Sequence, residues 1–303
     1  MKEHLVLSKA PLGKGLFPTT ELLLLLVALF WGTSYGITKS ALGFASVFLF
    51  LSIRFLSTFL LLLYPTVRAF RADKNADWLV SLPTGLILFI IFSCEVAGVA
   101  MTTATNAVFL ISLSAIMTVF IDILVNRSLL DRRLLVLASV SVLGVYLLIA
   151  DNSLAIDWNL GDGLILLAAL FRALMVTLTK RLTQGKRLTT TSLTALQSLV
   201  VGLGSLIVLL TQGESAMGQI PTEPVFWWLM AYLVLFCTLF AFFVQNYAVR
   251  QTSPARVAIL MGSEPLFGAV FAMAWLGEVL TGLQALGALL ILVSVILASK
   301  RGV

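Results

Sequence analysis

The chain has 303 residues, of which 60% are hydrophobic and 11% are charged, and it carries a net charge of +6. So apolar a composition excludes a soluble globular domain, in which about a quarter of the residues are charged. A nucleic-acid partner is excluded as well, because the basic residues lie in short connections between apolar segments, where the anionic face of a membrane accounts for them.

Apolar segments follow one another along the chain, several of them with the roughly 20 residues needed to cross a hydrocarbon core of about 30 Å. They must be helices, because only a helix satisfies its own backbone in lipid outside a closed barrel. We therefore predict an all-α membrane protein with ten transmembrane helices. In chain order these cover residues 20–40, 44–66, 78–98, 102–124, 134–150, 161–180, 191–211, 225–247, 254–275 and 281–299.

The basic residues predict the orientation of these helices. Seventeen of the 20 Lys and Arg residues lie in alternate connections, which the positive-inside rule places in the cytoplasm. The other connections contain Lys39 and the acidic residues Asp151, Asp157, Asp162, Glu214 and Glu223. We expect a multi-pass protein of the cytoplasmic (inner) membrane, with both termini in the cytoplasm and residues 1–20 as a cytoplasmic tail.

The two halves of the chain are related in sequence. Residues 26–39 align without gaps on residues 167–180, with six identities in fourteen positions, and these are the first and sixth predicted helices. Because each copy has five helices, an odd number, the second copy enters the membrane from the opposite face. This predicts two inverted five-helix repeats, in residues 21–150 and 151–303, with a substrate site between them near the midplane.

Four short motifs support a more specific reading. They are Trp31-Gly32-Thr33-Ser34, Ile53-Arg54-Phe55-Leu56, Glu264-Pro265, and Leu276-Gly277-Glu278 with Gln284 and Gly287 after it. With these motifs the chain resembles the drug/metabolite transporter superfamily, and specifically its EamA-type exporters. The resemblance implies a ten-helix exporter of small metabolites with a central cavity formed mainly by helices 1, 3, 4, 6, 8 and 9. The first half departs from the pattern, because Arg127-Ser128 and Ala115 stand where the second half has Gly277-Glu278 and Pro265.

Charged residues inside the spans are the first candidates for function, since a charge at the centre of a bilayer costs at least about 2.5–3.5 kcal/mol. Arg54 matches the second-span Arg of the family, and a structural role between helices competes with a functional one. Arg172 occupies the repeat position of Trp31 and is expected to hold a carboxylate or phosphate by bidentate hydrogen bonds. The alternatives for Arg172 are helix pairing and snorkelling.

Two carboxylates are candidates for coupling or gating. Glu264 precedes Pro265, which removes a backbone hydrogen bond and is expected to bend the ninth helix beside a proton or cation site. An ion pair of Glu264 with Arg54 or Arg172 is the alternative. Glu95, toward the outer end of the third helix, is the second candidate for protonation, unless it simply faces water. Proton coupling is therefore left open.

Aromatic and polar side chains complete the predicted site. Trp31, Tyr35 and Thr38 share one helical face that could stack against a substrate. Gly32 and Gly36 have the spacing of close helix packing. Asn106 and Gln245 are expected to bind substrate or to bond neighbouring helices, as are Gln197 and Asn246.

Enzymatic, metal and cofactor sites are not indicated. The chain lacks the common hydrolase and phosphate-loop motifs, its single histidine is His4, and Cys94 and Cys237 both fall within spans. We therefore expect a secondary exporter of an amino acid or related metabolite, as a monomer or homodimer, with no metal and no cofactor. A non-transporting scaffold or a channel-like protein is the alternative.

Overall fold

The computed structural model describes residues 19–102, 104–127, 129, 131–149, 159–212, 220–268, 270 and 281–299. All regular secondary structure in this part of the chain is helical, which confirms the predicted all-α class. The Leu276-Gly277-Glu278 motif and most of the predicted N-terminal tail lie outside the described residues.

The helices follow the predicted spans, with ends that differ by a few residues. The first half contains α1 (Thr19–Ala41), α2 (Val47–Arg71), the short 3₁₀ helix η1 (Trp78–Val80), α3 (Ser81–Met101), α4 (Ala104–Ser112), α5 (Ser114–Asn126) and α6 (Arg132–Ile149). The second half contains α7 (Leu160–Thr183), α8 (Thr190–Thr211), α10 (Pro224–Tyr232), the π-helix η2 (Leu233–Phe240), α11 (Ala241–Gln251), α12 (Pro254–Met261) and α14 (Gly282–Ser299).

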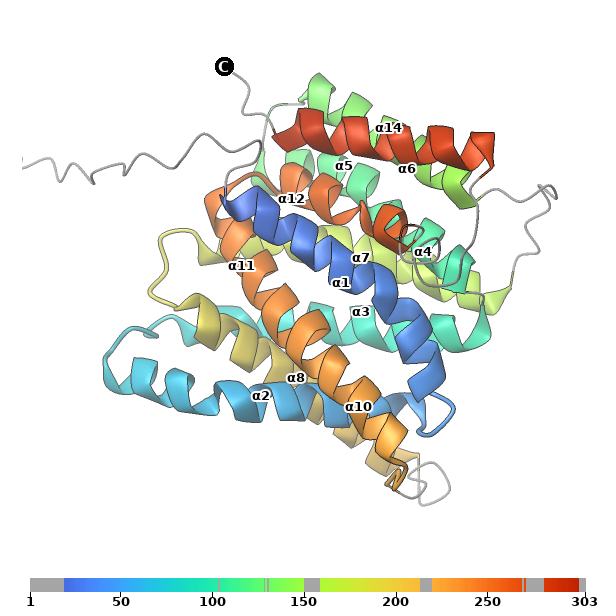
Figure 1. The fold of residues 1–303 in the computed structure, drawn as a ribbon. Coiled ribbons are helices and arrows are strands. Elements are labelled where there is room, and N and C mark those ends of the chain that lie inside the picture. Colours follow the sequence, from blue (N-terminus) through green and yellow to red (C-terminus); the bar gives the residue numbers. More distant parts are fainter. Residues whose placement is uncertain are drawn as a thin grey trace, which may run out of the picture.

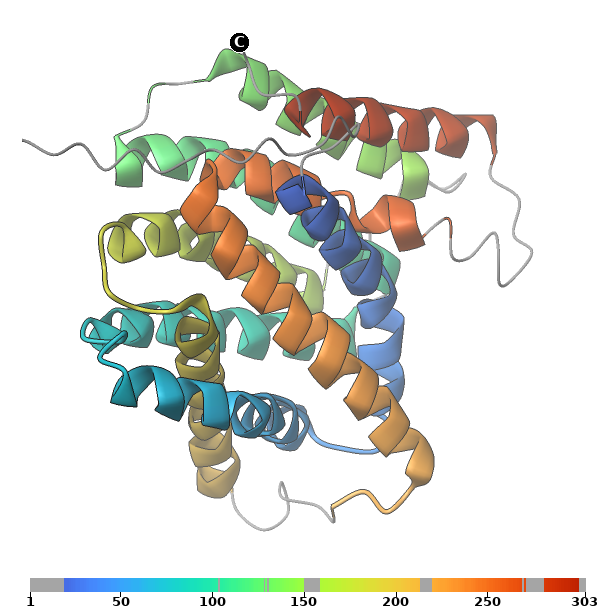
Figure 2. The same ribbon diagram turned by 60° about the vertical axis from the view of Figure 1, so that its left-hand side comes forward.

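Most of these helices have the length and composition of membrane spans. Among the described residues, seven segments are long and apolar enough to cross a bilayer, and residues 282–298 form a shorter apolar helix. The longest of the seven runs from α10 through η2 into α11 and crosses the bundle diagonally (Figure 2). The chain is therefore a multi-pass membrane protein.

Alternate connections meet at the same end of the bundle. The Asp77 carboxylate accepts the backbone N–H of Arg187 at 2.8 Å, and Arg187 also pairs with Asp73 at 3.0 Å. The hydrogen bond from Arg187 lowers the pKa of the Asp77 carboxyl. Lys180 on α7 donates to the carbonyl of Arg250 near the end of α11 at 3.1 Å. We call this end, with connections 72–77 and 184–189, the basic end.

A different set of contacts holds the opposite end. The Lys39 ammonium at the end of α1 donates to the Thr102 carbonyl at 2.8 Å, and the Thr102 hydroxyl donates to Asp162 at 2.5 Å. Asp162 also closes a capping box with Asn159 at the start of α7. Lys39 and Lys180 thus lie at opposite ends of the bundle, each capping a helix C-terminus.

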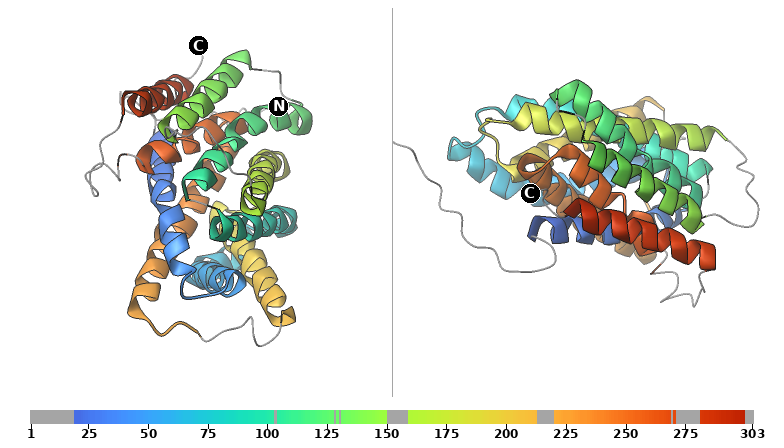
Figure 3. Two further views of the ribbon diagram at one scale, coloured as in Figure 1. Left: turned by 90° about the vertical axis from the view of Figure 1, so that its right-hand side faces the viewer. Right: turned by 90° about the horizontal axis from the view of Figure 1, so that it is seen from above.

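The helices pack in pairs that link the two halves. α2 packs on α8 and α6 packs on α14, and the two pairs lie on opposite sides of the bundle (Figures 1 and 3). α3 packs on α7 and α1 packs on the stretch from η2 to α11. Likewise, α5 packs on α7 and α12 packs on α1. By order along each half, α1 corresponds to α7, α2 to α8, α3 to the stretch from η2 to α11, α5 to α12 and α6 to α14. Exchanging every helix for its counterpart gives the same set of contacts.

Two of the predicted helices are interrupted. The span predicted at 102–124 is divided at Leu113 into α4 and α5, and the span predicted at 254–275 ends as α12 before the chain becomes helical again at Glu264. At both breaks an N–H bonds three residues back, from Leu113 to Leu110 at 3.3 Å and from Ser263 to Leu260 at 3.4 Å. Serine hydroxyls at the breaks bond to helix carbonyls at 2.6 Å, which favours bending.

The break in the second half differs from the bend that was expected at Pro265. The helix ends before Gly262 and Ser263, so the chain is interrupted rather than bent. The first half is interrupted at the corresponding place although Ala115 stands there in place of the proline. Proline is therefore not required for this break.

Candidate functional site

A buried cavity lies at the centre of the bundle, between α1, α2, α3, α7 and α11. Its volume is about 30 Å³, which holds about two water molecules. We call it the central cavity, and its lining combines charged, aromatic and aliphatic side chains. Seven of the predicted site residues line it: Trp31, Tyr35, Thr38, Arg54, Glu95, Arg172 and Gln245.

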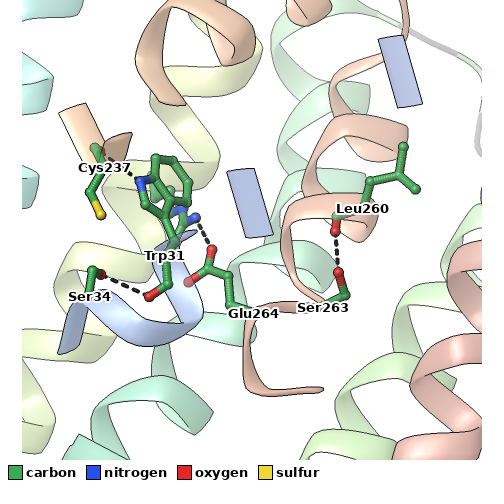
Figure 4. A network of polar contacts seen from close by, with 7 residues as sticks. Trp31, Ser34, Cys237, Leu260, Ser263 and Glu264 are labelled. Atoms are coloured by element: carbon green, nitrogen blue, oxygen red, sulfur yellow. Dashed lines mark hydrogen bonds and ion pairs between the residues drawn. The ribbon is translucent and has the colours of Figure 1, made fainter. Parts of the chain in front are cut away.

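Arg172 and Glu264 form an ion pair beside this cavity. The guanidinium donates to the Glu264 carboxylate, and both side chains are buried, with exposed fractions of 10% and 3%. The face of the Trp31 ring lies 4.4 Å from the Arg172 guanidinium carbon, within the range of a cation–π interaction. Figure 4 shows Trp31 and Glu264 in the same network of polar contacts. Arg172 thus takes the helix-pairing role that the sequence left open.

Trp31 is itself held by η2. Its indole Nε1 donates to the Cys237 carbonyl at 2.8 Å (Figure 4), and its ring lies 5.4 Å from the Phe242 ring. Tyr35 and Thr38 follow on the same face of α1, and both are buried against the cavity. The predicted face of α1 therefore lines the central cavity, with one side of Trp31 covered by Arg172.

Arg54 enters the same cavity from α2, and its surroundings are aromatic. Its Nε donates to the Thr238 hydroxyl at 2.7 Å. Its guanidinium carbon lies 5.2 Å from the Phe92 ring, 5.7 Å from the Phe55 ring and 6.0 Å from the Phe50 ring. Among the described residues, Arg54 has no carboxylate within the 4.0 Å of an ion pair.

Two oxygen-bearing groups in the cavity lack protein partners. Glu95 on α3 is half-buried, and among the described residues its carboxylate has neither a hydrogen bond nor an ion pair. Gln245 on α11 is 2% exposed, and its Oε1 has no hydrogen-bond partner in the structure. A buried polar group without a partner costs free energy, so both are positioned to receive a ligand or water.

Other predicted polar residues serve the packing of helices. The Asn246 amide donates to Gln197 at 2.7 Å and to Thr194 at 3.0 Å, and Gln197 donates to Thr84 at 2.9 Å. This network joins α3, α8 and α11 away from the cavity lining, so bonding between helices explains Gln197 and Asn246. Asn106 belongs to α4, and its side chain lies outside the described part of the structure.

The two helix breaks border a second, smaller cavity of about 10 Å³. It is lined by Arg172 and by residues from both breaks, including Ser112, Ser114, Gly262, Glu264 and Pro265. Arg172 also lines the central cavity, so the Arg172–Glu264 pair lies between the two spaces. Broken helices at mid-membrane are tolerated where protein or a cavity satisfies the freed backbone groups.

Sequence reasoning did not find the contribution of η2. The Thr238 hydroxyl donates to the Leu233 carbonyl five residues earlier at 2.8 Å, and it accepts the hydrogen bond from Arg54. The Cys237 carbonyl accepts from Trp31. A π-helical turn often marks a functional site, but nothing in the apolar sequence of residues 233–240 signals one.

Comparison with known proteins decides the family. The model of the EamA-like transporter family matches the chain twice, over residues 18–150 and 159–300. The chain belongs to the EamA-like transporter family. The resemblance inferred from the sequence motifs is confirmed, and the chain is a transporter of this family, which favours transport over catalysis.

Two archaeal transporters are similar to the chain along most of its length. An uncharacterized transporter of Archaeoglobus fulgidus is 29% identical over 283 residues, covering 93% of this chain and 86% of the relative. One of Methanothermobacter thermautotrophicus is 26% identical over 235 residues, covering 76% of this chain and 66% of the relative. A crystal structure with 14% sequence identity has the same fold, with a TM-score of 0.77 over 92% of this chain and 96% of the other.

Proposed function

We propose that this EamA-like protein is a secondary transporter that exports a small metabolite, most simply an amino acid, from the cytoplasm by alternating access. The observation that carries the proposal is the central cavity, where Arg54 and Glu95 face the same buried space beside aromatic and aliphatic side chains. A buried charge is costly unless it is paired or binds a ligand. Such a lining suits a substrate with both charge and apolar surface.

The small size of the central cavity supports a transport cycle with more than one state. A space of about 30 Å³ is too small for an amino acid, so the cavity must widen to admit one. The reciprocal packing of the helices supports ten helices arranged as two inverted repeats. In such repeats, rocking of one half against the other exposes the site to each face in turn.

The basic end of the bundle has the character of an entrance for substrate. An open hollow of about 730 Å³ lies there, and its lining includes Arg127, Lys180 and Arg181. Positive charge around an opening raises the local concentration of groups that carry a carboxylate. With the basic end in the cytoplasm, as the positive-inside rule predicts, this hollow faces the pool from which an exporter loads.

Reporter fusions will test the proposed orientation. Fusions after about residues 72, 130, 185 and 252 are expected to report the cytoplasm, and those after about residues 156 and 216 the exterior, because basic connections are retained inside. The measurement is the ratio of alkaline phosphatase to green fluorescent protein activity at each position. An exterior signal near residue 185 would contradict both the orientation and the inverted repeat.

Transport itself is tested with purified protein in liposomes. Liposomes preloaded with unlabelled leucine are expected to accumulate radiolabelled leucine by exchange, with and without a pH gradient. Protein-free liposomes and liposomes that contain an unrelated membrane protein are the controls. If no amino acid exchanges, the proposed substrate class is wrong, and a dependence of the rate on the pH gradient would identify proton coupling.

A further inference from the structure

Several polar groups that line the central cavity have no hydrogen bond to a described residue once the Arg172–Glu264 ion pair is formed. They include the two terminal amino groups of Arg54, the carboxylate of Glu95 and the Oε1 atom of Gln245. Arg54 donates only through its Nε to a described residue, so its remaining donors face the cavity. These groups give a ligand in the cavity a cationic donor and two oxygen acceptors.

We propose that Arg54 binds the carboxylate of the substrate and that Glu95 and Gln245 bind its ammonium group. The inference rests on the proposed transport function and adds to it the side chains that recognise the two charges of an amino acid with an apolar side chain. Arg172, which the sequence suggested for the carboxylate, is occupied by Glu264 and positions the site instead.

The geometry around Arg54 suits recognition of a carboxylate. Its Nε is fixed on Thr238, which leaves the two terminal amino groups on the side of the guanidinium that can form paired hydrogen bonds. The rings of Phe50, Phe55 and Phe92 surround the guanidinium and restrict its rotation. A guanidinium held in this way loses little conformational entropy when it binds.

The acceptor groups are separated from Arg54, as a dipolar ligand requires. Glu95 and Arg54 line the same cavity but do not approach within the 4.0 Å of an ion pair. A ligand between them would satisfy both charges, and an unpaired carboxylate or amide oxygen accepts readily from an ammonium. The rest of the lining is largely apolar and includes Leu88, Ile91, Val96, Val99 and Met175, which favours an aliphatic side chain on the ligand.

Binding to the purified protein in detergent tests the proposal without requiring transport. The probes are leucine, leucinamide, which lacks the carboxylate, and isocaproate, which lacks the ammonium. Wild-type protein is expected to bind leucine at least about tenfold more tightly than either analogue, because each missing group leaves a buried charge unpaired. Equal binding of leucine and one analogue, or no binding of any probe, would overturn the assignment.

Two variants assign the groups to their partners. Arg54→Gln should bind leucine no better than leucinamide, and Glu95→Gln should bind leucine no better than isocaproate. The controls are Arg68→Gln, on an exposed site of the same helix, and Glu223→Gln, also exposed. Equal losses for leucine and leucinamide in Arg54→Gln would give Arg54 a structural role and contradict the proposal.

Two further measurements separate the outcomes. If Arg54→Gln does not fold, Arg54→Lys is the second variant. It keeps the positive charge but lacks the planar pair of terminal amino groups, so it should weaken the binding of leucine more than that of leucinamide. If liposomes exchange leucine but the purified protein does not prefer leucine to its two analogues, the proposed site is wrong and the transport function stands. If the protein prefers leucine to both analogues but liposomes show no exchange, the transport function is wrong and the zwitterion site stands.

Discussion

Replacing Arg172 by Met is expected to destabilise the protein by about 3–5 kcal/mol, because it leaves the Glu264 carboxylate buried without its partner. Glu264→Leu should have a comparable effect through the unpaired guanidinium. The double variant Arg172→Met with Glu264→Leu should be more stable than either single variant, since it removes both charges together. The measurement is the midpoint of thermal unfolding in detergent, followed by size-exclusion chromatography.

The same variants distinguish a packing role from substrate binding. Because Arg172 donates to Glu264 and lies against the face of Trp31, its loss should weaken the binding of leucine and of leucinamide by the same factor. This differs from the pattern expected of Arg54→Gln. If the destabilisation of the double variant equals the sum of the two single variants, the two side chains are not coupled. If Arg172→Met weakens the binding of leucine but not that of leucinamide, Arg172 binds the substrate carboxylate.

Replacing Gly32 by Ala is expected to disrupt the contact between α1 and the segment that carries Glu264. A Cβ atom at Gly32 would lie 2.4 Å from the Glu264 carbonyl oxygen and 3.1 Å from the Gly268 nitrogen, and both are backbone atoms that cannot rotate away. Overpacking of this kind costs about 1–3 kcal/mol. The shift would also displace Glu264, so we expect reduced leucine exchange as well as a lower unfolding midpoint.

Gly36→Ala is the matched control on the same helix. A Cβ atom at Gly36 meets nothing within 4 Å, so Ala should be neutral or should stabilise α1 by up to about 1 kcal/mol through helix propensity. Both variants are measured by thermal unfolding and by exchange in liposomes. Equal behaviour of the two variants would show that the close approach at Gly32 does not limit packing.

Much of the architecture was readable from the sequence because lipid imposes simple rules. The length of each apolar segment shows where a helix can span the membrane. The helical repeat places Trp31, Tyr35 and Thr38 on one face of α1, and in the structure this face lines the central cavity. The cost of burying charge singled out Arg54, Glu95, Arg172 and Glu264, and all four lie at the two cavities.

The pairing of those charges could not be read from the sequence. Glu264 could equally have paired with Arg54 or Arg172, and the choice depends on how α7 and the segment after α12 approach each other in three dimensions. The π-helix that presents Thr238 to Arg54 has no signal in an apolar stretch, because local propensity does not distinguish π from α turns there. The break at Leu113 has no signal in the sequence, because Ala115 stands where the second half has its proline.

The two helix breaks have a consequence for how the protein assembles in the membrane. A Cβ atom at Gly262 would lie 3.5 Å from the Cβ of Ala115, so the break of each half lies against that of the other, with Arg172 beside both. Lipid cannot satisfy the backbone groups that a break releases. Before the second half of the chain is present, the break between α4 and α5 lacks the segments that cover it. Although the family model recognises each half separately, the first half depends on α7 and α12 of the second to cover its break, and we expect it to be incompletely packed in the membrane without them.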